Sequence, residues 1–168
     1  FDLLNAELQL TLKIASVIGR SFNLPLLQAA HPLKLSRSAL RVQITKLQQH
    51  HFLASQSTQS STIYRFQHQL VQEGIYESMP LDQQIALHYA VGNGLATQAK
   101  GELEQLAWHF WRCRAEHPEE ALRYVKQAAK QAQNYANHAA LDFYNQALEL
   151  SPKDVDCLKG KVETLHVL

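Results

Sequence analysis

Three residues near the middle of the chain have the types and the spacing of a metal site. His109, Cys113 and His117 follow one another at intervals of four residues, so one face of a helix can present all three. Imidazole nitrogen and thiolate sulfur are ligands that zinc prefers. Pro118 follows His117 at once, which places His117 at a helix boundary and disfavours this arrangement. We therefore expect no metal site in the chain.

Basic side chains on one predicted helix are the second candidate. Arg37, Arg41 and Lys46 can contact the phosphates and bases of DNA from such a helix. Residues 1–95, however, hold seven Lys and Arg against five Asp and Glu, a net charge of only +2. A duplex-binding protein usually neutralises several phosphates. The low charge therefore favours a protein-docking role for this helix. DNA contact through these three residues is the alternative.

Motifs of catalysis and of tight nucleotide binding are missing from the sequence. Gly160 and Lys161 are followed by Val162 and lack the earlier glycine of a phosphate-binding loop. There is no G-x-S-x-G motif, and no pattern places a base beside Cys113 or Cys157. We expect the chain by itself to be non-catalytic and to hold no cofactor.

The composition is that of a folded, non-membrane protein. The 168 residues are 46% apolar and 18% charged, with a net charge of +1, which excludes a disordered chain. The length is sufficient for one domain or two small ones. Two cysteines cannot form a disulfide framework, which favours a reduced, cytoplasmic compartment. No apolar run approaches the roughly 20 residues of a membrane span, so we expect no membrane contact.

The first half of the chain predicts three helices followed by a hairpin. Asn5 is the expected N-cap of the first helix, the second helix is expected to start at Asn23, and the third is expected to start near Ser36. Residues 52–55 and 62–66 then predict two short strands, and helical spacing resumes after them. Helix, helix, helix, hairpin is the order of a winged helix-turn-helix domain, which we assign to residues 1–80. The predicted fold class is thus mainly α with a small β-hairpin.

The second half predicts helices alone. A connecting helix is expected over residues 81–100, where Gly92 and Gly94 predict a bend or an early end. Residues 101–168 are expected to form tetratricopeptide-like α-hairpins. This repeat is about 34 residues long and requires small residues at positions 8, 20 and 27, an aromatic residue at 24 and proline at 32. Counted from Ala121, these positions hold Ala128, Ala140, Ala147, Tyr144 and Pro152.

A final apolar stripe predicts the first helix of a following repeat. It consists of Val155, Leu158, Val162 and Leu165. Repeat units need neighbours to bury their apolar faces. We therefore expect the chain to be part of a longer protein, with the array truncated at its C-terminus.

Three stretches of the chain resemble a known family. The most specific reads YRFQHQLVQE from Tyr64 and continues through IYES to Ser78, and the others are GRSF at Gly19–Phe22 and LAWHF at Leu106–Phe110. Together they resemble the region behind the ATPase domain of STAND-type (AAA/NACHT) signalling ATPases. In that family a winged helix and tetratricopeptide-like repeats follow the ATPase core. The core is often fused to a class III adenylate or guanylate cyclase, a LuxR-type regulator or a Ser/Thr kinase.

The resemblance implies a regulatory region of a cytoplasmic bacterial signalling protein. Its expected partners are the neighbouring ATPase domain of the same chain and, through the helical repeats, a regulatory protein or effector domain. ATP or ADP is expected for the parent protein and not for this chain. The alternatives are a free-standing tetratricopeptide-type interaction module and a winged-helix DNA-binding regulator.

The resemblance also implies a role for one histidine. In related NACHT-type switches, a histidine in a Phe-x-His…Gln-Glu context contacts the β-phosphate of ADP in the closed state. His68 stands in that place, with Phe66, Gln72 and Glu73 around it. It would sense nucleotide only when an upstream ATPase domain is present. The other interpretation makes His68 a residue at a helix N-terminus that is bonded to local backbone.

Overall fold

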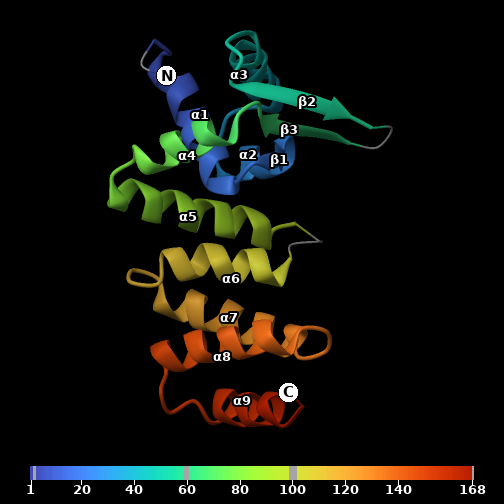
Figure 1. The fold of residues 1–168 in the computed structure, drawn as a ribbon. Coiled ribbons are helices and arrows are strands. Elements are labelled where there is room, and N and C mark those ends of the chain that lie inside the picture. Colours follow the sequence, from blue (N-terminus) through green and yellow to red (C-terminus); the bar gives the residue numbers. More distant parts are fainter. Residues whose placement is uncertain (2, 59–60, 99–101, 168) are drawn as a thin grey trace. The chain divides into compact units, whose positions relative to one another are not determined.

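The computed structural model describes residues 1, 3–58, 61–98 and 102–167. They form a mainly helical protein with one small antiparallel sheet, and this part of the predicted fold class is confirmed (Figure 1). The chain divides into two compact units, residues 1–98 and 99–168. No helix of the described residues is both long enough and apolar enough to cross a membrane.

The first unit contains five helices and three strands in its described residues. They are α1 (Ala6–Ile18), β1 (Ser21–Asn23), α2 (Leu24–Ala30), α3 (Arg37–Gln49), β2 (Leu53–Ser57), β3 (Thr62–Phe66), α4 (Gln69–Glu77) and α5 (Leu81–Ala96). The first three helices begin where the sequence predicts, and Asn5 is the predicted N-cap of α1. The side chains of Asn5, Asn23 and Ser36 each accept a hydrogen bond from the backbone N–H three residues on, at 2.8 to 3.2 Å.

The sheet has one strand more than the sequence predicts. Its order is β1–β3–β2, with both pairings antiparallel, and only the β2–β3 hairpin is expected from the sequence. In β1, Phe22 lies opposite Tyr64 and its ring stacks on that of Tyr64 with centroids 5.8 Å apart. Three residues between two helices are too short to show an alternating pattern. The strand exists because β3 offers it a pairing edge.

The core of the first unit lies where α1, α2 and α3 meet the sheet. The largest fully buried apolar side chains of the first unit are Leu12, Ile14, Val17, Leu27, Leu40, Ile44, Leu47, Leu53, Phe66 and, on α5, Val91. Leu40, Ile44 and Leu47 are the apolar stripe that the sequence predicts for α3. Because this stripe turns inward, the other face of α3 is exposed.

The helix expected as a connector packs within the first unit. α5 contacts α2 and α1, and it ends at Ala96, whereas residues 99 and 100 of the predicted connector lie outside the described residues. It also runs without a break through Gly92 and Gly94, although each glycine costs a helix about 1 kcal/mol relative to alanine. A Cβ on Gly94 would lie 3.2 Å from the Cβ of Ala29. This glycine therefore permits the close approach of α5 to α2.

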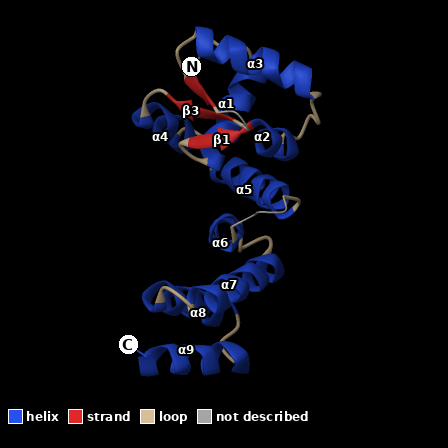
Figure 2. Cartoon of the chain, turned by 90° about the vertical axis from the view of Figure 1, so that its right-hand side faces the viewer, coloured by secondary structure: helices blue, strands red, loops and turns tan. Residues whose placement is uncertain are grey.

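The second unit contains four helices in its described residues. They are α6 (Leu103–Arg112), α7 (Pro118–Ala132), α8 (Asn137–Leu150) and α9 (Val155–Val167). Each packs against the next along the chain, and Figure 2 shows this succession from α6 to α9. The ring of Phe110 on α6 stacks on that of Tyr124 on α7 at 4.6 Å between centroids. Consecutive antiparallel packing follows from the short loops between the helices.

Candidate functional site

The exposed face of α3 carries the basic residues that the sequence singles out. Arg37 and Arg41 are one turn apart, and both are exposed. The buried Leu40 and Ile44 fix the rotation of the helix and thereby the direction in which the arginines leave it. Lys46 is exposed as well, but it does not line the cavity described next. The structure thus brings two of the three predicted residues together.

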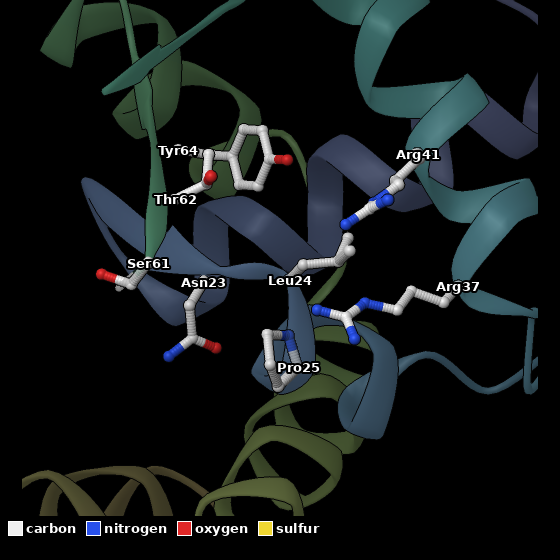
Figure 3. Close-up of a pocket in the computed structure, with 8 residues that line it drawn as sticks. All are labelled: Asn23, Leu24, Pro25, Arg37, Arg41, Ser61, Thr62 and Tyr64. Atoms are coloured by element: carbon white, nitrogen blue, oxygen red, sulfur yellow. The ribbon is translucent and has the colours of Figure 1, made fainter. Parts of the chain in front are cut away.

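Arg37 and Arg41 form one wall of a cavity of about 210 Å³ in the first unit. The other walls come from the start of α2 and from β3 with the residue before it. Their lining residues are Asn23, Leu24, Pro25, Ser61, Thr62 and Tyr64. Figure 3 shows both guanidinium groups pointing from α3 toward Leu24 and Pro25. The positive charges therefore enter the cavity rather than project away from the unit.

Hydrogen-bond donors line the same cavity. The Oδ1 atom of Asn23 accepts from the backbone N–H of Leu26 at 2.8 Å, which leaves the side-chain NH2 group of Asn23 as a donor. Tyr64 adds a phenolic hydroxyl, whereas the hydroxyls of Ser61 and Thr62 lie 3.3 and 3.2 Å from those of Thr58 and Ser57. Among the described residues, no carboxylate lines the cavity. The described lining is therefore positive in charge.

His68 lies at the N-cap position of α4 and is exposed. Its side chain makes no capping hydrogen bond, whereas its carbonyl accepts from the backbone N–H of Val71 at 3.2 Å. Two neighbours from the same motif have structural roles. Phe66 is in the core, and the side-chain amide of Gln72 donates to the carbonyl of Ser16 at 2.7 Å. The imidazole of His68 itself is on the surface of the first unit.

The residues with metal-ligand spacing do not assemble into a metal site. No group of three His, Cys, Asp or Glu side chains in the described part of the chain could hold a metal ion. The buried thiol of Cys113 donates to the carbonyl oxygens of His109 and Phe110 at 3.5 and 3.4 Å. Burial raises the pKa of Cys113 to about 11, so at pH 7 it is a neutral thiol rather than a thiolate ligand. His117 is at the N-cap of α7, as Pro118 predicts.

The residues predicted to pack the repeat lie along α7 and α8. Ala128, Ala140 and Ala147 are fully buried, and Tyr144 is 3% exposed. Small side chains allow two helices to approach closely. Pro152 is exposed and follows the end of α8 at Leu150.

Among the described elements, helix α9 packs against α8. Its Gly160 lies against the ring of Tyr144, and the carbonyl of Gly160 accepts from the side-chain amide of Gln133 at 3.0 Å. A separate apolar stripe is 44 to 60% exposed and consists of Val155, Leu158, Val162 and Leu165. Leu158 and Val162 also line an open cavity of about 330 Å³. The stripe is the one that the sequence singles out.

Asn23 and Tyr64 are the site residues that the sequence does not reveal. They come from different elements, and the pairing of β1 with β3 brings them beside α3. The alternation of buried and exposed residues in β3 predicts a strand, but it does not say which helix the strand faces.

The comparisons with known proteins add no relative. No family model, no curated protein and no solved structure matches the chain.

Proposed function

We propose that the chain is a non-catalytic regulatory and protein-interaction region of a STAND-type signalling ATPase. In this proposal the first unit is a winged helix that docks on the ATPase domain, and the second unit is a tetratricopeptide-like array that binds an effector domain or a regulatory protein. The order of helices and strands in the first unit supports the first assignment. The succession of antiparallel helices supports the second.

The exposed stripe of α9 is the observation that carries the proposal. Leu158 and Val162 lie 34 residues after Tyr124 and Ala128 of α7. The two α7 residues are 7% and 0% exposed, whereas Leu158 and Val162 are 44% and 52% exposed. α9 thus repeats α7 in sequence register but lacks the cover that α7 has. On α7, Phe110 of α6 covers Tyr124, and a further helix packed on the stripe of α9 would cover Leu158 and Val162 in the same way, as neighbouring helices do in an array of repeats.

The state of the cysteines supports a role without covalent chemistry. Burial raises the pKa of Cys113 and of Cys157 to about 11. A thiol with that pKa is a poor nucleophile at neutral pH, because the thiolate is the reactive form. Binding therefore explains this chain better than nucleophilic catalysis does.

The gene that encodes the chain provides the decisive test. We expect a Walker A motif, G-x-x-x-x-G-K-[S/T], roughly 200–300 residues upstream of Phe1. An open reading frame without this motif would contradict the ATPase assignment. The second unit would then be better described as a free-standing interaction module.

A histidine substitution tests the nucleotide-sensing role within that parent protein. His68 is exposed at the start of α4, where an imidazole N–H can donate to a phosphate oxygen of a docked nucleotide. A contact made only in the closed state stabilises that state. We expect His68→Ala to raise the basal activity of the parent protein and to weaken its affinity for ADP. Unchanged activity and affinity would remove His68 from the mechanism.

DNA binding is the second candidate, because Arg37, Arg41 and Lys46 are all exposed on α3. A gel shift with random duplex DNA at rising salt tests it. A DNA-binding unit would lose affinity steeply with salt. It would also lose affinity in Lys46→Gln.

A further inference from the structure

Two positive charges converge on the small cavity of the first unit without an ionic partner. Within the described residues, the ion pairs join Lys126 to Asp154 and Asp156, so neither Arg37 nor Arg41 is in one. Like charges one turn apart destabilise a helix. An anion bound between the two guanidinium groups would reverse that effect, and none of the described lining residues is a carboxylate that could take its place.

The geometry of the donors matches a phosphate group. A guanidinium group presents pairs of parallel N–H donors, which fit the oxygens of a phosphate. Arg37 and Arg41 point into the cavity from one side (Figure 3). The side-chain amide of Asn23 and the hydroxyl of Tyr64 lie on other walls of the same cavity. Figure 3 shows the hydroxyl of Tyr64 pointing toward the arginines, whereas the side chain of Asn23 points away from them. The two guanidinium groups and the Tyr64 hydroxyl can therefore hold an anion with several acceptor oxygens.

The cavity is large enough for a phosphate group at the end of a ligand, but it is too small to enclose a large ligand. Its volume of about 210 Å³ is below the roughly 300–1,000 Å³ of pockets that enclose drug-sized molecules. A phosphate with a short attachment fits this space better than a complete nucleotide does. Leu24 and Pro25 give the floor an apolar surface on which the attachment can rest.

The direction of the side chains disfavours duplex DNA as the ligand. A helix that reads DNA enters the major groove, so its contact residues must project beyond the rest of the domain. Arg37 and Arg41 instead point toward the start of α2 (Figure 3). Both side chains are nevertheless exposed, so DNA binding is kept as an outcome of the test below.

We propose that this cavity binds a phosphate group through Arg37 and Arg41, with the hydroxyl of Tyr64 as a further donor. Free phosphate and a phosphorylated side chain share this chemistry. The proposal goes beyond the proposed regulatory function and does not depend on it, because it concerns a cavity within the first unit alone.

A nuclear magnetic resonance titration of the 168-residue chain tests the proposal. Inorganic phosphate and O-phosphoserine are added separately at constant ionic strength. We expect saturable shifts in the signals of Asn23, Arg37, Arg41 and Tyr64 with at least one of the two probes. Tighter binding of O-phosphoserine would identify a phosphorylated protein as the source, and equal binding would identify free phosphate.

Variants of α3 separate a built site from general positive charge. Arg37→Gln and Arg41→Gln should each weaken binding about tenfold or more, the effect of losing one charge-assisted hydrogen bond. Lys46→Gln is the matched control, because it removes the same charge from the same helix outside the cavity. It should change the affinity by less than about twofold, as expected for a screened surface charge. All three side chains are exposed, so the variants are expected to keep the thermal transition of the unchanged chain.

Three results would overturn the proposal. Shifts that do not saturate would show that no phosphate site exists. Equal losses in Lys46→Gln and Arg37→Gln would show attraction by net charge alone. In the third result, random duplex DNA displaces the probe, and Lys46→Gln lowers the affinity for the duplex as much as the arginine variants do. This result would show that α3 is a DNA-binding surface.

Discussion

Gly160 on α9 lies so close to Tyr144 on α8 that a larger side chain requires movement. A Cβ atom at this position would lie 2.3 Å from the Cζ and Oη atoms of the buried Tyr144 ring. In an open helix, replacing glycine by alanine adds about 1 kcal/mol of stability. Here the overlap acts against that gain, because overpacking a well-packed site costs about 1–3 kcal/mol. Gly160→Ala should therefore lower the free energy of unfolding, measured in urea.

Gly74 on α4 is the matched control for this substitution. A Cβ there would meet no atom within 4 Å, so Gly74→Ala should stabilise the chain. Replacing Tyr144 by Leu shortens the side chain and should reduce the cost of Gly160→Ala in a double-mutant cycle. If Gly160→Ala stabilises the chain as Gly74→Ala does, the ring of Tyr144 can move away. The close packing of Gly160 on this ring would then contribute nothing to the free energy of unfolding.

We expect His31 to make the stability of the first unit depend on pH. Its buried ring accepts from the backbone N–H of Leu33 at Nδ1, at 3.3 Å, and Nε2 lies 3.2 Å from the hydroxyl oxygen of Thr11. This assigns the proton of the neutral ring to Nε2, which donates to Thr11. Burial lowers the pKa of His31 from 6.5, and the charge of Glu7 opposes that shift in part. The unfolded chain therefore binds the proton more tightly than the folded chain does.

The sign of the pH effect follows from that difference. The contribution of neutral His31 to stability is complete above about pH 6.5 and is lost as the pH falls through the lowered pKa. His31→Asn keeps an acceptor for Leu33 and removes the titration. The free-energy advantage of the unchanged chain over this variant should shrink when urea unfolding is measured at decreasing pH. Parallel pH profiles for the two proteins would exclude His31 as the cause.

At the scale of elements, the same valine-to-threonine substitution can be made at a buried position on α7 and at an exposed position on α9. Val125 on α7 is fully buried, and Val162 on α9 is 52% exposed. Replacing valine by threonine changes the shape little but introduces a hydroxyl group, which costs about 1–3 kcal/mol when it is buried without a partner. In the 168-residue chain, Val125→Thr should clearly lower the melting temperature, and Val162→Thr should leave it nearly unchanged.

The same pair of variants tests whether a helix covers α9 in a longer protein. If a following helix packs on the exposed stripe, Val162→Thr becomes a buried substitution there. It should then destabilise a chain extended beyond Leu168 about as much as Val125→Thr does. An extended chain in which Val162→Thr still has no effect would show that this face of α9 remains open to solvent.

Local patterns in the sequence predict the elements that carry their own signals. The cap at Asn5, the start of α3 near Ser36 and the stripe of α3 are local features, so they are predicted correctly. β1 is missed because its three residues are a strand only through their pairing with the distant β3. An amphipathic pattern shows which face of a helix is buried, but it does not show the partner. For this reason α5 is predicted as a connector, although it packs on α1 and α2.

The candidate site shows the same division between local and distant information. Helical spacing places Arg37 and Arg41 on one exposed face. The cavity needs Asn23 from the start of α2 and Tyr64 from β3 as well. The tertiary structure alone brings these side chains together, so the cavity could not be predicted from the sequence.

At the scale of the whole molecule, the two compact units should unfold as separate cooperative events. Residues 1–98 and 99–168 each have a core of their own, in which Leu12 of α1 and Val125 of α7 are fully buried. Truncating a buried leucine or valine to alanine lowers the stability of its own unit by roughly 1–5 kcal/mol. Mutations at distant sites with no shared partners act independently. Each truncation should therefore shift the transition of its own unit alone.

The position of the tryptophans allows the two transitions to be read separately. Both tryptophans of the chain, Trp108 and Trp111, are on α6 in the second unit. Tryptophan fluorescence thus reports the second unit, whereas far-ultraviolet circular dichroism reports the helices of both. Leu12→Ala should shift the circular dichroism curve in urea and leave the fluorescence curve in place. Val125→Ala should shift both. Coincident fluorescence and circular dichroism curves in all three proteins would mean that the chain unfolds as one cooperative unit. The cores of the two units would then be coupled across residue 98.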